Sequence, residues 1–256
     1  MSHRDTPWPA GTPCWVDIAV PDVSAATAFY GDVIGWSFVD TGEEFGHYTI
    51  AQTDGRAAAA ITPQQEGGQP PYWSTYLATQ DTDATAKLIT ENGGTLLVEP
   101  MDVPGNGRFA IALDPTGGAF GIWQAAGMNG FTIANEPGSV TWNEARLTDL
   151  DAGKAFYAVV FGHTYQEIPA APDDYATIQV GGEPVGGIVR GQEGVPSHWL
   201  TYFSVADVDA AVAAATRGGA TVLMPAESTP FGRMSILTDP FGATFGVHRA
   251  PEDGTR

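Results

Sequence analysis

Two short runs in the chain combine a tryptophan with an acidic residue two positions later. Trp15 precedes Asp17, and Trp142 precedes Glu144 and Arg146. Alternate residues of a strand point to the same face, so each run would present an indole beside a carboxylate. An aromatic wall with one carboxylate is suited to a planar or cationic organic ligand. Either acid would also be a candidate general base if burial raised its pKa.

The same runs also allow a structural interpretation, in which the tryptophans fill the interior of a sheet and neighbours satisfy the carboxylates. For Trp15 and Asp17 the sequence leaves both interpretations open, whereas Arg146 beside Glu144 favours an internal ion pair. Two tyrosines on later strands could add phenols to the same faces. The candidate ligand-binding residues are Trp15, Asp17, Tyr76, Trp142, Glu144, Arg146 and Tyr202, and the candidate catalytic residues are Asp17 and Glu144.

The candidates come in pairs because the chain repeats itself. Phe29-Tyr30 recurs as Phe156-Tyr157, 127 residues later, and the same offset carries Trp15 to Trp142. This period is far longer than that of solenoid repeats, so each copy is predicted to be a domain. The predicted domains are residues 11–125 and 138–250. The linker at 126–137 is rich in glycine and proline, and we expect it to be exposed.

Hydrophobic periodicity alternates between strand and helix within each copy. A strand near 14–20 is followed by Asp22 as a helix cap, a helix that ends at Gly35, and three short strands near 36–40, 48–52 and 57–61. The pattern then restarts near residue 73, with its last three strands near 95–98, 108–113 and 119–124. The prediction is an α+β fold in which each copy contains two βαβββ units.

These features together resemble the vicinal oxygen chelate superfamily, which includes the glyoxalases, the extradiol dioxygenases and the bleomycin- and fosfomycin-resistance proteins. The resemblance rests on the paired βαβββ units, on the Phe-Tyr that follows Asp22 and Asp149 by seven residues, and on a closing Asp-Pro-x-Gly-x-x-Phe-Gly at 114–121 and 239–246. More narrowly, the chain looks like the two-domain glyoxalase-like proteins that include a secreted mycobacterial antigen. The resemblance implies that each domain curves its sheet into a cup with a pocket inside.

The superfamily's metal ligands are missing from the positions that the resemblance designates. Its enzymes take ligands from the opening strands, seven residues before the aspartate, and a glutamate seven residues after the Asp-Pro aspartate. His248 is expected to be a hydrogen-bonded surface residue. We therefore predict no metal and no cofactor, since the glycine-rich turn at 105–107 also lacks the context of a P-loop. The designated positions hold Trp15, Ser74, Trp142, Leu200, Gly121 and Gly246.

Composition limits the partners. The 11 basic and 30 acidic residues give a net charge of −19, which argues against nucleic acid and anionic membranes. The sequence shows no signal peptide and no membrane span, so we expect a cytoplasmic protein, with non-classical secretion left open. Its single cysteine, Cys14, is expected to be a small buried side chain. We expect a monomer or a homodimer, because fusion can supply the pairing that single-domain relatives obtain by dimerising.

The sequence favours a metal-independent protein of the glyoxalase/bleomycin-resistance type that binds a small organic ligand, expected to be aromatic, in the cup of one or both domains. One alternative is a metal-free tailoring enzyme or hydroxylase of secondary metabolism. Another is a metal-dependent glyoxalase or dioxygenase with unconventional ligands, so that an enzyme would be a lyase or an oxidoreductase. A third alternative is a protein with filled cups that acts only through its surface.

Overall fold

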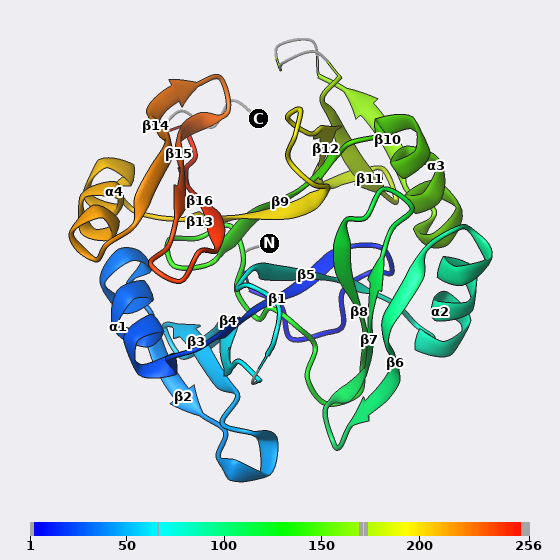
Figure 1. Ribbon diagram of the computed structural model, residues 1–256, viewed down its shortest axis with the longest axis horizontal. Helices are drawn as coiled ribbons and strands as arrows, with labels where there is room; N and C mark the ends of the chain where they lie inside the picture. The colour runs from blue at the N-terminus through cyan, green and yellow to red at the C-terminus, as the bar shows by residue number, and fades with distance from the viewer. Residues whose placement is uncertain (1–2, 66, 169–170, 172–173, 252–256) are drawn as a thin grey trace.

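The computed structural model describes residues 3–65, 67–168, 171 and 174–251. Over this part of the chain, two eight-stranded sheets and four α-helices form the predicted α+β fold (Figure 1). Each sheet is built from one copy of the repeat and curves into an open arch. None of the described helices has the length and apolar character needed to cross a membrane.

The first sheet joins its two βαβββ units through their opening strands. β1 and β5 pair antiparallel at the centre, with Trp15 opposite Tyr76 and Asp17 opposite Ser74. The strand order is β2-β3-β4-β1-β5-β8-β7-β6. The elements are β1 (Pro13–Val20), α1 (Val23–Ile34), β2 (Ser37–Asp40), η1 (Glu43–Phe45), β3 (Thr49–Thr53), β4 (Arg56–Pro63), β5 (Trp73–Ala78), α2 (Thr82–Glu91), β6 (Thr95–Val103), β7 (Gly107–Leu113) and β8 (Ala119–Ala125).

The second sheet repeats this arrangement, in the order β10-β11-β12-β9-β13-β16-β15-β14. Its central strands pair antiparallel as well, with Trp142 opposite Tyr202 and Glu144 opposite Leu200. The elements are β9 (Val140–Leu147), α3 (Leu150–Phe161), β10 (Thr164–Glu167), β11 (Ala176–Val180), β12 (Glu183–Arg190), β13 (His198–Ser204), α4 (Val208–Arg217), β14 (Thr221–Thr229), β15 (Gly232–Thr238) and β16 (Thr244–Arg249).

The helices begin where the sequence predicts. Asp22 accepts a hydrogen bond from the Ala25 backbone N–H at 2.9 Å, and an aspartate caps each of the other three α-helices in the same way. A side-chain acceptor at this place satisfies one of the backbone donors that a helix start leaves unpaired. α1 ends at Gly35, whose φ of 87° is a left-handed conformation that glycine adopts without steric cost.

β6 is longer than predicted, because it continues past Pro100 to Val103 instead of ending near Val98. β6 is the edge strand of its sheet, so it has no neighbouring strand on one side. A proline, which lacks a backbone N–H, is tolerated there because no hydrogen bond between strands is lost on that side. The prediction ended this strand near residue 98 and was therefore wrong about its length.

Each of the two large cores contains residues from both copies of the repeat. α1 packs against α4, and α2 packs against α3, so the helices lie between the backs of the two sheets (Figure 1). In one core the ring of Tyr30 lies 5.5 Å from that of Phe245. In the other, the ring of Phe120 lies 5.6 Å from that of Tyr157.

The repeated Phe-Tyr and Asp-Pro motifs meet across this interface. The hydroxyl of Tyr157 donates a hydrogen bond of 2.9 Å to Asp114, and the hydroxyl of Tyr30 bonds to Asp239 in the same way. The motifs that carry the family resemblance therefore form hydrogen bonds between the two copies.

The linker at 126–137 is not the exposed connection that its composition suggested. Phe131, Ile133 and Ala134 are buried, and the backbone N–H of Phe131 donates to the carbonyl of Cys14 at 2.7 Å. Thr132 bonds to Ala57 of β4. The two glycines and the single proline of 126–137 therefore belong to a packed segment. Cys14 is fully buried, as expected, and burial raises the pKa of its thiol.

Candidate functional site

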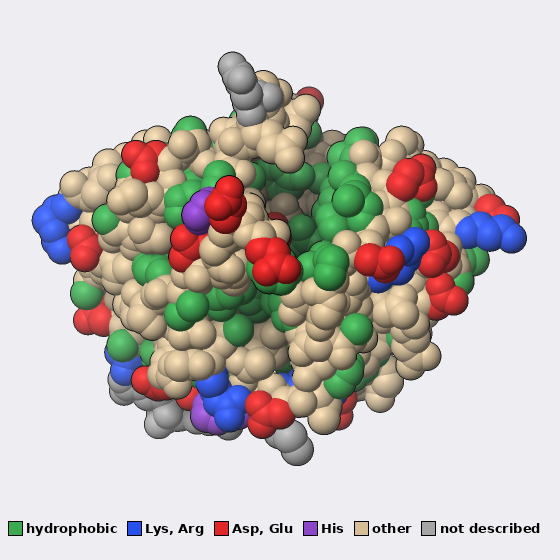
Figure 2. Space-filling view, turned by 90° about the horizontal axis from the view of Figure 1, so that it is seen from below, with side chains coloured by type: hydrophobic (Ala, Val, Ile, Leu, Met, Phe, Trp, Pro, Cys, Tyr) green, Lys and Arg blue, Asp and Glu red, His purple; other side chains and the backbone are tan. Residues whose placement is uncertain are grey.

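The concave face of the first sheet carries the candidate residues of the first copy. Strand register places Val39, Ile50, Ala60 and Asp17 in one row across that face. A second row runs through Trp15, Tyr76, Gly121 and Ile111. Figure 2, seen from the side of β2, β3, β6 and β7, shows a hollow surrounded by hydrophobic side chains. We call the concave face of the first sheet the first cup, and define it by the hydrogen-bonded residues Trp15, Asp17, Tyr48 and Tyr76.

Asp17 is the centre of a hydrogen-bond network in the first cup. Its carboxylate accepts bonds from the hydroxyls of Tyr48 at 2.9 Å and Tyr76 at 3.1 Å. The indole N–H of Trp15 donates to the Tyr48 hydroxyl at 2.7 Å, so three aromatic side chains fix one acid. Burial raises the pKa of Asp17 to about 6, and the bonds from both tyrosines oppose that rise.

Asp17 can therefore change protonation state close to neutral pH while its position stays fixed. As a whole residue Asp17 is of intermediate exposure, and it lies on the concave face of the first sheet. The ionised form accepts hydrogen bonds and attracts cations, whereas the protonated form can donate one bond.

Trp15 supports Tyr48 through a hydrogen bond and does not form an open wall of the first cup. It is only 3% exposed, and its ring lies 5.7 Å from that of Phe131. The open hydrophobic surface on this side comes from other residues, and Val39, Tyr72 and Met101 are each at least 40% exposed. A flat apolar molecule in the cup would contact these side chains more readily than it would contact Trp15.

The second copy holds its acid differently. Arg146 Nε lies 2.7 Å from Glu144 Oε1, and Arg146 Nη2 donates to the Tyr202 hydroxyl at 3.0 Å. Trp142 donates to Tyr175 at 2.9 Å, as Trp15 does to Tyr48. Glu144 is buried and neutralised by its neighbour, which is the ion pair that the structural interpretation described. We call the set Trp142, Glu144, Arg146, Tyr175 and Tyr202 the second cup.

Both cups lack room for the superfamily's metal-binding glutamate. A Cβ atom added to Gly121 would collide with the ring of Tyr76, and one added to Gly246 would collide with Tyr202. Each phenol thus occupies the space that a ligand side chain would need. His248 is half-buried, and its Nε2 lies 2.9 Å from the Phe231 carbonyl, in agreement with the hydrogen-bonded role expected for it.

Histidine, cysteine and acidic side chains do not assemble elsewhere either: the described residues contain no cluster of three or more of them. With neither opening-strand ligands nor space for the glutamate, the donor set does not fit the metal that glyoxalases and extradiol dioxygenases of this superfamily use.

Sequence reasoning missed two members of the site, Tyr48 and Tyr175. Each lies just before a strand and accepts a hydrogen bond from the tryptophan of its copy, and Tyr48 also donates to Asp17. The signal was present, because Tyr175 follows Tyr48 at the same 127-residue offset that relates Trp15 to Trp142.

Comparison with known families and structures agrees with this architecture. The family described as Glyoxalase/Bleomycin resistance protein/Dioxygenase superfamily matches residues 14–122 and, a second time, residues 144–247. "Putative glyoxylase CFP32" of Mycobacterium tuberculosis (strain CDC 1551 / Oshkosh) is 40% identical over 245 residues, which cover 93% of this chain and 94% of the relative.

Anthracycline biosynthesis protein DnrV of Streptomyces peucetius is 34% identical over 254 residues, covering 93% of this chain and 92% of the relative. The Mn(II)-bound glyoxalase from Novosphingobium aromaticivorans shares the fold with a TM-score of 0.65 at 17% identity, over 97% of this chain and 83% of that protein. For 2,2',3-trihydroxybiphenyl 1,2-dioxygenase from Sphingomonas wittichii strain RW1 the TM-score is 0.64 at 14% identity, over 96% and 93% of the two chains.

Proposed function

The chain belongs to the glyoxalase/bleomycin resistance protein/dioxygenase superfamily, and from this premise we propose that its first cup binds a planar organic molecule without a metal ion. The observation that carries the proposal is the arrangement around Asp17. Tyr48 and Tyr76 hold this acid on the concave face of the first sheet, in one row with Val39 and Ile50. Such a pocket combines apolar walls with one polar group that orients the ligand.

The ligand class follows from the shape and chemistry of the first cup. Val39, Ile50 and Ile111 offer apolar contact, and Tyr72 adds an exposed aromatic ring. An acid that titrates near pH 6 accepts a hydrogen bond from a hydroxyl or an ammonium group of the ligand. Two relatives carry the name anthracycline biosynthesis protein, and anthracyclines are fused-ring aromatic compounds with hydroxyl groups. Their chemistry is compatible with this cup.

A second candidate function is metal-free proton transfer by Asp17. A general base works best when its pKa lies near the pH of the reaction, and the pKa of about 6 meets this condition. Tyr48 and Tyr76 would stay in place to donate hydrogen bonds as the acid gains and loses its proton. Glu144 is less suited to this role, because it already pairs with Arg146.

Binding is tested by titrating the protein with quinizarin, a neutral dihydroxyanthraquinone, and following the quenching of tryptophan fluorescence. We expect saturable binding that Asp17→Asn weakens about tenfold, since one oriented hydrogen bond to a charged group is lost. Glu144→Gln is the matched control in the second cup and should leave that binding unchanged. Equal effects of the two substitutions, or no saturation, would contradict the proposal for the first cup.

Proton transfer is tested with a carbon acid that has a similar shape. The bicyclic ketone 2-tetralone exchanges its α-hydrogens in D₂O, and NMR measures the rate. The second candidate predicts faster exchange with the protein, an inflection near pH 6 and no acceleration by Asp17→Asn. If wild type and variant gave the same rate, Asp17 would have no role as a base.

A further inference from the structure

A separate pocket lies between the N-terminal arm, residues 3–12, and the ends of β5 and β8. Its volume is about 410 Å³, which falls within the ~300–1,000 Å³ typical of small-molecule sites. Its lining does not include any of the four residues that define the first cup. Its lining includes Arg4, Trp8, Gln80, Trp123 and Asn129.

Half-buried Trp8 and Trp123, which is 8% exposed, both line this pocket. The indole N–H of Trp8 donates to the carbonyl of Phe131 at 3.1 Å, and that of Trp123 donates to the carbonyl of Met128 at 2.9 Å. Because each N–H already has its partner, the ring surfaces that remain are apolar. Rings that are held in this way can contact an aromatic ligand without first losing side-chain entropy.

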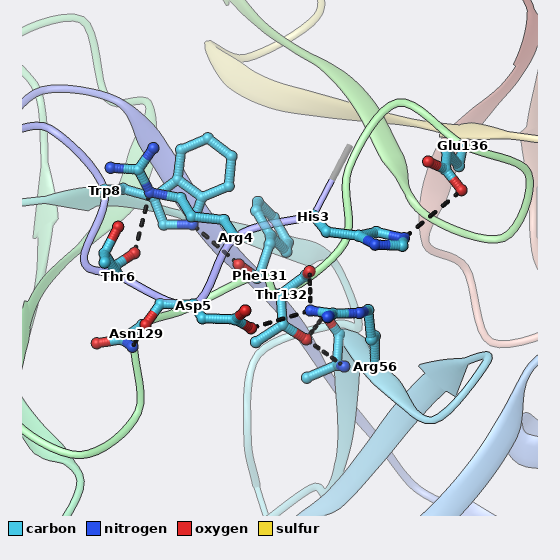
Figure 3. Close-up of polar contacts among 11 residues, drawn as sticks. His3, Arg4, Asp5, Thr6, Trp8, Arg56, Asn129, Phe131, Thr132 and Glu136 are labelled. Atoms are coloured by element: carbon cyan, nitrogen blue, oxygen red, sulfur yellow. Dashed lines mark hydrogen bonds and ion pairs between the residues drawn. The ribbon is translucent and has the colours of Figure 1, made fainter. Parts of the chain in front are cut away.

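Arg4 brings the pocket a positive charge that no acidic side chain neutralises. Its guanidinium lies over the ring of Trp8, 5.0 Å from the centroid, and in the described part of the chain no carboxylate lies within ion-pair distance of it. The neighbouring Asp5 points to Arg56 instead, at 3.0 Å (Figure 3). Five other arginines do pair with acids: Arg56, Arg108, Arg146, Arg190 and Arg233.

The guanidinium is oriented but not saturated. Its Nε donates to the carbonyl of Thr6 at 2.9 Å, and its Nη2 donates to the carbonyl of Pro7 at 2.6 Å. An arginine has five N–H donors, so the two hydrogens on Nη1 and the second hydrogen on Nη2 are left over from these bonds. Nη1 and Nη2 together form the fork that binds a carboxylate through both of its oxygens.

The arm that carries Arg4 is anchored to the body of the protein. The backbone N–H of Arg4 donates to the carbonyl of Thr132 at 3.1 Å, and Asn129 Nδ2 donates to the carbonyl of Asp5 at 3.0 Å (Figure 3). His3 forms a bridge to Ile133 beside it. These contacts hold the positive charge at the pocket, which is what a binding site requires.

We propose that this pocket is a second ligand site, distinct from the first cup, and that it takes small aromatic carboxylates. The carboxylate binds the Nη1 and Nη2 fork of Arg4, and the aromatic ring packs against Trp8 and Trp123. The side-chain amides of Gln80 and Asn129 add polar groups for a ring substituent. The net charge of −19 opposes binding of anions, but this long-range repulsion is screened beyond about 8 Å at physiological salt.

The test compares 2-naphthoate with 2-naphthamide, its uncharged analogue, by tryptophan fluorescence titration. We expect wild type to bind the naphthoate saturably and at least about tenfold more tightly than the amide, as a charge-assisted bond predicts. Arg4→Gln should remove this preference and leave binding of the amide unchanged. The matched control is Arg217→Gln, which removes the same charge from an exposed position at the end of α4.

The proposal is wrong if naphthoate and amide bind equally to wild type, if Arg4→Gln binds naphthoate like wild type, or if Arg217→Gln loses as much. Asp17→Asn separates the two sites. Unchanged naphthoate binding in that variant supports the second site, whereas its loss would place naphthoate in the first cup. This second site does not depend on the proposed function of the first cup, because its lining contains none of the four residues that define the cup.

Discussion

Tyr30 and Asp239 stand 209 residues apart in the chain, yet the hydroxyl of one donates a 2.6 Å hydrogen bond to the carboxylate of the other. The indole N–H of Trp73 donates to the same hydroxyl at 2.9 Å. Burial raises the pKa of Asp239, against the bonds that Tyr30 and the turn backbone donate to it. The relay is buried and joins the two copies of the repeat.

Replacing Tyr30 by Phe should lower the free energy of unfolding by about 1–3 kcal/mol, because it removes a bond to a desolvated acid. Urea denaturation measures the change. Tyr157→Phe breaks the reciprocal bond to Asp114 and should cost a similar amount. A wild-type midpoint in both variants would show that these bonds do not stabilise the pairing of the copies.

Gly121→Ala should destabilise the protein by about 1–3 kcal/mol, because the new Cβ would overlap the ring of Tyr76. The cost should shrink when Tyr76 is also replaced by Ala, and a double-mutant cycle measures this coupling. Gly31→Ala on α1 is the control: its Cβ would meet neighbours at an ordinary 3.6 Å, so we expect stabilisation of up to about 1 kcal/mol. Additive effects at Gly121 and Tyr76 would contradict the steric explanation.

Asp17 should make the protein less stable as the pH rises. Its pKa is about 6 in the folded state, above the ordinary carboxyl value near 3.9, so the folded state binds the proton more tightly. Its contribution is complete below about pH 4 and is lost as the pH rises through about 6. Relative to wild type, Asp17→Asn should therefore gain about 2 kcal/mol between about pH 4 and pH 8. Urea denaturation at both pH values checks this, and a constant difference would contradict it.

His163 should make the protein less stable as the pH falls. It is buried and stacked on Phe161, with Nε2 2.7 Å from the Gly11 carbonyl, and burial lowers its pKa to about 4. Its contribution is complete above about pH 6.5 and is lost as the pH falls towards about 4, because the unfolded chain then binds the proton more tightly. His163→Phe keeps a ring in place and should lose less stability than wild type between about pH 7 and pH 4.5. Parallel denaturation curves for the two proteins would exclude this role.

Divalent metals should not stabilise the protein through either cup. Tyr76 and Tyr202 occupy the space of the glutamate ligands, so Mn²⁺, Ni²⁺ or Zn²⁺ should leave the midpoint of thermal unfolding unchanged, and EDTA should leave it unchanged as well. A concentration-dependent rise with one metal, lost in Asp17→Asn, would show that Asp17 belongs to a metal site.

Local signals made most of the fold predictable. The aspartate caps, Gly35 and the alternation along β1 and β9 are encoded within a few residues of the elements that they define. β6 was misjudged because only its place at the edge of the sheet makes Pro100 acceptable. The linker was misjudged for a similar reason, since the burial of Phe131 depends on Trp15 and on the N-terminal arm.

The site was predictable only in part. Period two placed Asp17 beside Trp15, and the adjacent charges predicted the pair of Glu144 with Arg146. The partners of Asp17 are Tyr76 on β5 and Tyr48 just before β3. Their contact with Asp17 depends on how the strands pair in the sheet, which no local sequence pattern encodes. The role of Tyr30 was hidden for the same reason, because its acceptor belongs to the other copy.

Each tyrosine–aspartate bond joins the Phe-Tyr motif of one copy to the Asp-Pro motif of the other, so both copies must keep these motifs. Packing between the copies depends on the duplicated Phe-Tyr and Asp-Pro motifs, so a change to a motif in one copy alters its packing against the other copy. The cups lie on the opposite faces of the sheets and are under no such mutual constraint. Duplication thus gave this protein two cups that can change independently, while the interface between the copies must be conserved in both. The cups already differ, because Ala19 corresponds to Arg146 and Ser74 to Leu200.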